Sequence, residues 1–230
     1  MLTKILKTGL YSVGIATWTV SSAALANLKL SDFYVDLHEN GRVDSIYASN
    51  QGREILFLKI SVAEVVNPGG ENQEVRKTAS PKELGLLVSP QRLVVKPGEE
   101  GRIRMVAMVE PEQDRFYKIT VEPVAGELQS KEQIGVKILV GYSAWAYVRP
   151  KGASPSVTGS REGNKLILTN NGSTLAQMMA GKICSAASSC EKIEPFRVQA
   201  GQQKTIDLPH ENAPVSFRMT WGNKSEDLNF

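Results

Sequence analysis

The side chains best suited to metal binding or nucleophilic catalysis are few in this sequence. Cys184, Cys190, His38 and His210 are its only cysteines and histidines, so one chain cannot assemble a zinc site with three or four such ligands. No glycine-rich nucleotide fingerprint, phosphate-binding loop or Gly-x-Ser-x-Gly nucleophile elbow occurs. The residues therefore predict no enzyme, no metal site and no cofactor, and they leave the cysteines available for a disulfide.

The amino-terminal segment predicts export. Residues 1–26 combine positive charges at Lys4 and Lys7, an uncharged stretch at 9–21, and small residues before a cleavage point after Ala26, which is the pattern of a secretory signal. An uncleaved membrane anchor is the alternative, but polar side chains interrupt the apolar run, which is shorter than the ~20 residues of a membrane span. We expect an exported protein without stable membrane insertion.

The two cysteines would then lie in an oxidising compartment, where disulfides persist. Cys184 and Cys190 enclose the small residues 185–189, which suit a hairpin tip closed by the bond. Two free thiols are the alternative, and the even cysteine count favours the bond.

A second set of residues suits binding rather than catalysis. In residues 134–141, four β-branched side chains occupy every second position of a predicted strand and would line one face of it; they are Ile134, Val136, Ile138 and Val140. Leu139, on the other face, would pack inward. Burial of both faces inside one sandwich is the alternative, but the polar residues 126–133 before the strand and a linker after it favour an edge position.

Short alternating or β-branched runs bounded by turn residues surround this strand and are typical of β-sandwiches. Residues 33–37 and 43–48, joined by an Asn40-Gly41 turn, predict a hairpin. The other predicted strands are residues 53–66, 93–95, 101–108, 116–124, 134–148, 165–169, 175–183, 196–198, 204–208 and 215–221.

A segment rich in proline and glycine at residues 149–155 predicts a domain boundary. We expect an all-β chain with two sandwich domains at residues 27–149 and 156–230 and a linker at 150–155, which are ordinary domain sizes. A single large barrel is the weaker alternative.

The overall composition agrees with a folded, exported protein that does not bind nucleic acid. Hydrophobic residues make up 41% and charged residues 22% of the sequence, and the formal net charge is +3. Removal of Lys4 and Lys7 with the signal would leave +1, which is too little for binding that depends on neutralising phosphates.

Three segments in succession resemble the periplasmic chaperones of chaperone–usher pili. They are residues 89–100 (SPQRLVVKPGEE), residues 115–124 (RFYKITVEPV) and the alternating strand that ends in AYVRP at residues 146–150. Their order and spacing are similar to that family from about Asn27 to Pro150. The two-domain length, the export signal and the cysteine pair fit the remainder.

The resemblance implies two immunoglobulin-like domains that meet in an L, and a location in the periplasm. It also implies that a donor strand is inserted into the incomplete sandwich of a pilus subunit, with Ile134, Val136, Ile138 and Val140 as the inserted residues. Strand addition forms main-chain hydrogen bonds along an edge, while alternate side chains fill pockets. The implied partners are pilus subunits and an outer-membrane usher, to which the subunit is delivered without ATP.

Two positions depart from the pattern of that family. Its members hold the subunit's terminal carboxylate with an arginine on the first strand and a lysine near the end of the donor strand, and the corresponding positions here are Tyr34 and Trp145. Neither residue carries a positive charge, so the chain resembles a divergent branch. Lys137 and Arg149 become candidate anchors, although Lys137 also suits a solvated strand position.

The resemblance further implies an interdomain ion pair at Arg149. Its candidate partners are Glu112 or Asp114, shortly before the strand at 116–124, and Glu211 in the second domain. Exposed charges that never meet are the alternative.

Two other classes of function stay open. A secreted structural or adhesive pilus component would need an incomplete sandwich and an amino-terminal donor extension, whereas Asn27 leads almost directly into a strand. A carbohydrate-acting enzyme would need a pair of carboxylates in a cleft, which no motif marks.

Overall fold

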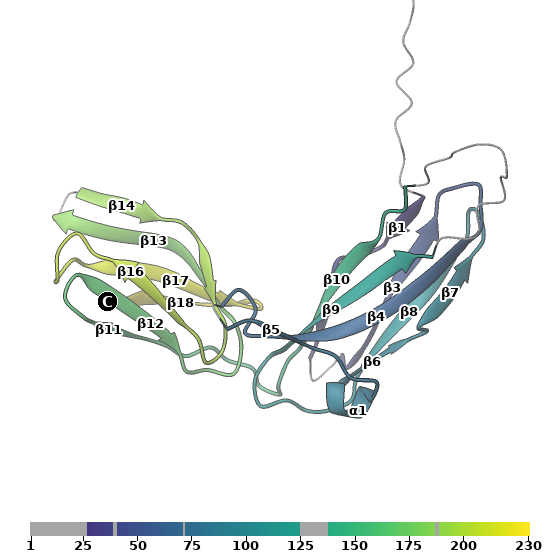
Figure 1. Cartoon of the computed structure of the whole chain (residues 1–230). Helices are drawn as coiled ribbons and strands as arrows, with labels where there is room; N and C mark the ends of the chain where they lie inside the picture. The colour runs from purple at the N-terminus through teal and green to yellow at the C-terminus, as the bar shows by residue number, and fades with distance from the viewer. Residues whose placement is uncertain (1–26, 39–40, 71, 125–137, 187–188) are drawn as a thin grey trace, which may run out of the picture.

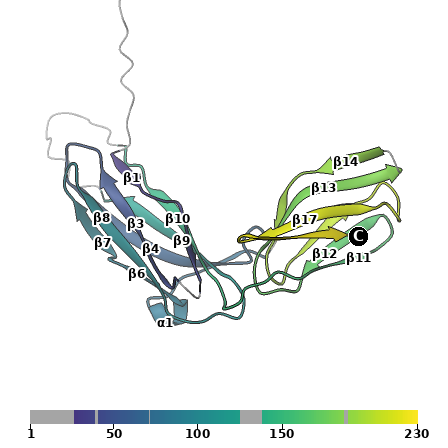
Figure 2. The same ribbon diagram turned by 180° about the vertical axis from the view of Figure 1, so that it is seen from behind.

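The computed structural model describes residues 27–38, 41–70, 72–124, 138–186 and 189–230. The predicted signal at residues 1–26 lies outside the described residues. The strands form two sandwiches that are joined at one end and inclined to each other (Figures 1 and 2). The all-β prediction with two domains is confirmed.

The first sandwich contains ten strands and one short helix in the described part of the chain. They are β1 (Leu28–Leu30), β2 (Tyr34–Leu37), β3 (Val43–Asn50), β4 (Leu56–Val66), β5 (Glu74–Arg76), α1 (Pro81–Leu84), β6 (Leu86–Ser89), β7 (Arg92–Val95), β8 (Glu100–Ala107), β9 (Arg115–Pro123) and β10 (Tyr142–Val148). One sheet has the order β1-β3-β8-β6, and the other has the order β2-β10-β9-β4-β5, with β7 beside β4.

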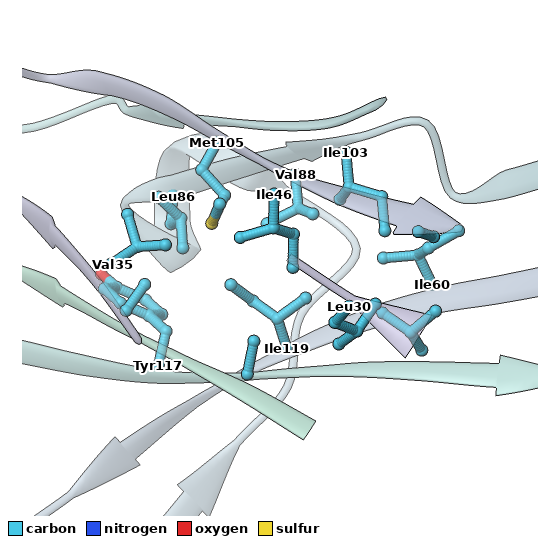
Figure 3. Close-up of a cluster of buried hydrophobic side chains, with 14 of the residues drawn as sticks. Leu30, Val35, Ile46, Ile60, Leu86, Val88, Ile103, Met105, Tyr117 and Ile119 are labelled. Carbon is cyan, nitrogen blue, oxygen red and sulfur yellow. The ribbon is translucent and has the colours of Figure 1, made fainter. Parts of the chain in front are cut away.

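The period-two pattern of the strands places the core between these two sheets. In β4, Leu56, Leu58 and Ile60 are buried while Phe57 and Lys59 face solvent. Figure 3 shows apolar side chains from both sheets meeting in the middle of the sandwich, among them Leu30, Ile46, Ile60, Val88, Ile103 and Ile119.

The predicted hairpin of residues 33–37 and 43–48 is wrong. The β2 strand pairs in parallel with β10, whereas β3 pairs with β1 and β8 in the opposite sheet. Only an isolated bridge between His38 and Gly41 remains of the expected ladder. The local turn signal was outweighed because β2 completes the edge of β10 and buries Val35 and Leu37 in the shared core.

The second sandwich is built in the same way. Its strands are β11 (Val157–Arg161), β12 (Lys165–Asn170), β13 (Ala176–Ala186), β14 (Ser189–Ile193), β15 (Phe196–Val198), β16 (Gln203–Asp207), β17 (Val215–Trp221) and β18 (Lys224–Asn229). The sheet β11-β12-β16 packs on the sheet β14-β13-β17-β18, in which β15 also pairs with β13.

The cysteine pairing is as predicted. Cys184 and Cys190 face each other across the β13–β14 hairpin and form a disulfide, with their Cα atoms 3.9 Å apart. No helix in the described ranges is long and apolar enough to cross a membrane.

Candidate functional site

The β10 strand has different neighbours at its two ends. The β9 strand pairs with all of Tyr142–Val148, whereas β2 pairs on the other side with the last four residues alone, from Trp145 onward. Among the described strands, none pairs with that side of residues 142–144. We call residues 138–144, on the side away from β9, the open edge, because their backbone groups offer a template for a further strand.

The apolar spacing of β10 continues into the open edge. Ala144, Ala146 and Val148 are fully buried in the core. Ile138 and Val140 keep the same even spacing, yet 83% and 43% of their surfaces are exposed. These two side chains continue the row of core-facing positions, but they lie beyond the end of the sandwich and its core does not cover them.

The strand predicted for residues 134–148 begins only at Tyr142 in the described part of the chain, so the predicted start was wrong. Residues 138–141 are described but lie in no strand. In the β9–β10 register, Val140 would face Pro123, which has no backbone N–H to continue the ladder. Ile134, Val136 and Lys137 lie outside the described residues.

Leu139 does not pack inward as expected. It is 38% exposed and lies with Lys118, Thr120 and Ser143 around a shallow hollow. Those neighbours belong to the outer face of the sheet, so the odd-numbered positions of this segment face away from the core.

The two positions that depart from the family pattern by lacking a positive charge lie side by side. Tyr34 and Trp145 are direct partners in the β2–β10 ladder. Burial, and then the charge of Asp36, raises the pKa of the Tyr34 hydroxyl to about 12, so it stays protonated. The Trp145 ring stacks on Phe116 with centroids 5.0 Å apart, and the Lys118 ammonium lies 5.7 Å from its centroid on the β9 side.

Arg149 directly follows β10 and joins the two sandwiches. Its Nε donates to both carboxylate oxygens of Asp36 at 2.7 and 2.9 Å. Its Nη1 donates to Oδ2 of Asp114 at 2.9 Å and to Oγ1 of Thr174 in the second sandwich at 2.6 Å. Its Nη2 donates to the Tyr34 hydroxyl at 3.2 Å. The guanidinium thus uses all three nitrogens.

Asp114 completes the connection to the second sandwich. Its Oδ2 accepts hydrogen bonds from the Thr174 hydroxyl at 2.7 Å and from the Leu175 amide at 3.0 Å. Burial raises the pKa of this carboxyl, and the charge of Arg149 opposes the shift. The Oδ1 atom is buried without a hydrogen-bond partner among the described residues.

Of the three partners expected for Arg149, only Asp114 contacts it in the described part of the chain. Within the described ranges neither Glu112 nor Glu211 pairs with Arg149, and the Glu211 carbonyl accepts from Arg161 instead. Asp36 supplies the second carboxylate. The parallel β2–β10 register puts Asp36 opposite Tyr147, two residues before Arg149. The sequence analysis did not predict this contact because it paired the strand that contains Asp36 with residues 43–48 instead.

A cleft of about 1020 Å³ separates the two sandwiches beside this network. Phe116 and Tyr147 line it from the first sandwich, and Phe196, Arg197 and Lys204 from the second. No acidic side chain is among its described lining residues. The cleft is therefore electrostatically suited to an uncharged or anionic chain rather than a cationic one.

Sequence reasoning missed three residues that the structure places here: Asp36, Lys118 and Thr174. Lys118 lies inside one of the segments that carried the family resemblance, but its proximity to Trp145 depends on the β9–β10 register. Asp36 and Thr174 come from distant parts of the chain, and no local pattern marks either.

Residues 31–150 match the family described as the CS5 fimbrial protein N-terminal domain, which covers more than half of the chain. The chain belongs to this family. Among curated proteins, a CFA/I fimbrial subunit of Escherichia coli is 25% identical over 174 residues, which are 72% of this chain and 71% of that protein.

Solved structures of fimbrial chaperones share the fold. The class 5 fimbriae chaperone CfaA has a TM-score of 0.73 at 20% identity, over 88% of this chain and 98% of that chain. A chain of the chaperone–tip adhesin complex of CFA/I fimbriae biogenesis has a TM-score of 0.72 at 22% identity, over 89% and 98%.

A more distant match is the CsuC–CsuE chaperone–tip adhesion subunit complex of Acinetobacter baumannii, with a TM-score of 0.57 at 18% identity, over 89% and 98% of the two chains. Together these matches confirm the resemblance to the chaperones of chaperone–usher systems at the level of the fold.

Proposed function

We propose that the chain is a periplasmic chaperone that captures fimbrial subunits by adding a β-strand to them and delivers them to an outer-membrane usher. The observation that carries this proposal is the exposed pair Ile138 and Val140, which continues the core-facing spacing of β10 along an open edge. Export by residues 1–26, periplasmic location and transfer to the usher are parts of the same proposal.

The open edge has the two features that strand addition requires. Its free side can form main-chain hydrogen bonds with a partner strand, and its apolar row can enter pockets of the partner's core. Burial of Ile138 and Val140 at about 1.5–3 kcal/mol each would supply roughly 3–6 kcal/mol before ordering costs. Ile134 and Val136 would lengthen the row by two further side chains.

The structural relatives support pilus subunits as the partner class. Two of these relatives were solved in complexes of a chaperone with a tip adhesin or a tip adhesion subunit. Another is the SafB chaperone of Salmonella enterica with the SafA pilin, which has a TM-score of 0.54 at 15% identity.

A structural pilus component is the second candidate, favoured by the name of the curated Escherichia coli relative, which describes it as a fimbrial subunit. Such a component would expose an unfilled core groove. Here Leu37, Ile46, Ile103 and Ile119 have no exposed surface in the first sandwich, and Leu168 and Met178 have none in the second. Both sandwiches therefore fill their own cores, which favours a donor of a strand over a recipient.

Replacement of Ile138 or Val140 by aspartate tests the proposal. A carboxylate forced into an apolar pocket should abolish capture, whereas the free protein should keep its melting temperature because both side chains are exposed in it. The measurement is co-purification of a secreted partner with each variant, alongside a melting curve. Val43→Asp, an exposed site in β3 of the opposite sheet, is the matched control and should retain the partner.

Retention of the partner by a folded Ile138→Asp variant would remove the donor role of the open edge. Equal loss of the partner by Val43→Asp would indicate a general effect of surface charge instead.

A further inference from the structure

The cleft between the two sandwiches has two unlike walls. Phe116 and Tyr147 make the wall of the first sandwich aromatic. The wall of the second sandwich presents Phe196 together with two cations, Arg197 on β15 and Lys204 on β16. The positive charge of the described lining residues is therefore concentrated on the second sandwich.

Both cations are available to a partner. Arg197 and Lys204 are exposed, and neither forms an ion pair or a side-chain hydrogen bond within the described ranges. The other two arginines of residues 156–230 are occupied, because Arg161 donates to two backbone carbonyls and Arg218 pairs with Asp227. Arg197 and Lys204 can therefore bind an incoming carboxylate without first giving up an internal contact.

An apolar surface adjoins Arg197. A shallow hollow is lined by Gln177, Met179, Pro195, Phe196 and Arg197, and Met179 is 39% exposed. Apolar side chains beside unpaired cations form a contact surface for a protein that carries acidic groups next to aliphatic ones.

The open edge faces this surface. The β10 strand lies on the side of the first sandwich that is turned toward the second sandwich (Figures 1 and 2). The distance along β10 from Tyr142 to Tyr147 in the cleft wall is about 17 Å at about 3.3 Å per residue. A folded domain of about 100 residues has a radius of gyration of about 13 Å. Such a domain on the open edge would therefore occupy the angle between the sandwiches and meet the second one.

We propose that the second sandwich selects its captured partner by charge, with Arg197 and Lys204 binding an acidic surface that lies outside the partner's strand groove. The proposal rests on the proposed strand capture and adds to it a preference among partners. Charges at the rim of an interface act mainly on specificity and on the rate of association, and salt screens them. The preference should therefore be strong at low salt and weak at high salt.

Synthetic peptides with a strand part and a tail test this preference. The strand part is nine residues of valine alternating with serine, and a twelve-residue glycine–serine linker joins it to three glutamates or three glutamines. Such a linker spans roughly 20 Å, which matches the distance from the open edge to the cleft. The tail is attached to each end of the strand part in turn, and both termini are blocked so that no terminal carboxylate is present.

Binding to the purified protein is measured by calorimetry in 20 mM and 500 mM sodium chloride. In at least one of the two arrangements the glutamate tail should bind about tenfold more tightly than the glutamine tail at low salt, and the difference should disappear at high salt.

The double variant Arg197→Gln/Lys204→Gln should lose the preference while still binding the glutamine peptide as the unaltered protein does. Its melting temperature should be unchanged, because neither side chain has an internal partner within the described ranges. Lys182→Gln/Lys192→Gln is the matched control. It removes the same charge from two exposed positions of the β13–β14 hairpin that do not line the cleft, and it should keep the preference.

Equal binding of both tails in both arrangements, or an unchanged preference in Arg197→Gln/Lys204→Gln, overturns the role of these two cations and leaves strand capture standing. An equal loss of preference in the control would mean that net charge acts without a site, which also overturns it. Failure of all the peptides to bind contradicts strand capture itself, and with it this proposal.

Discussion

The two ends of the segment from Ile138 to Val148 share one apolar alternation but have opposite surroundings. At the carboxyl end, Val148 has no exposed surface and its strand is held between β9 and β2. At the amino end, Ile138 is almost fully exposed. The comparison shows that the same pattern is buried in the core where the chain supplies a strand on both sides of β10, and is exposed where the ladders to β9 and β2 do not extend.

The largest expected effect on stability is at the carboxyl end of this segment, which we call the closed end; the amino end, at Ile138, is the open end. Val148→Asp would bury a carboxylate among apolar side chains of the core and should lower the free energy of unfolding by more than about 4 kcal/mol, as measured by denaturant titration.

Leu139→Asp is the matched variant at the open end and should change the same quantity by less than about 0.5 kcal/mol. A destabilisation of similar size in both variants would mean that residues 138–141 pack inward in solution and that the two ends do not differ.

The next effect is expected where the closed end meets the second sandwich. Arg149→Met would leave the buried carboxylate of Asp114 without its cation and should cost about 3 kcal/mol. Small-angle scattering should at the same time show a wider spread of interdomain angles.

Arg218→Met is the control for this variant, because it breaks an Arg–Asp pair that lies on the surface and should leave both the stability and the scattering curve unchanged. Unaltered scattering from Arg149→Met would show that other contacts fix the interdomain angle.

The smallest effect concerns the proton on Asp114. Because burial raises the pKa of this carboxyl above its ordinary value of 3.8, the folded protein binds a proton at Asp114 more readily than the unfolded chain does. The contribution of this proton to stability is fully present below the ordinary pKa and is lost as the pH rises through the raised one. As the pH falls through this range, the free energy of unfolding of the parent protein should therefore rise relative to that of the Asp114→Asn variant.

Urea titrations of the two proteins at several pH values provide the measurement for Asp114. A stability difference that is independent of pH would exclude a raised pKa. A difference that grows in the opposite direction would mean that Arg149 dominates over burial at this carboxyl.

Local patterns predicted much of the fold and part of the site. The predicted bounds of β15 and β17 are those observed, and the disulfide followed from two cysteines in an exported chain. The row of Ile138 and Val140 was visible because period-two alternation is a property of neighbouring residues. The pairing of β2 with β10 was not visible, because the Asn40-Gly41 turn signal is local while the parallel ladder joins residues more than a hundred positions apart.

The sequence by itself determined the β-sandwich class, the cysteine pair and the identity of the apolar row, since each depends on residue type and short spacing. The tertiary structure alone decided which part of that row is buried, because burial depends on where β2 begins and where β9 reaches Pro123. It also decided that Asp36 joins Arg149 and that Lys118 lies over Trp145. These contacts cross between strands that are distant in sequence, and the register of the ladders, which no local pattern encodes, brings them together.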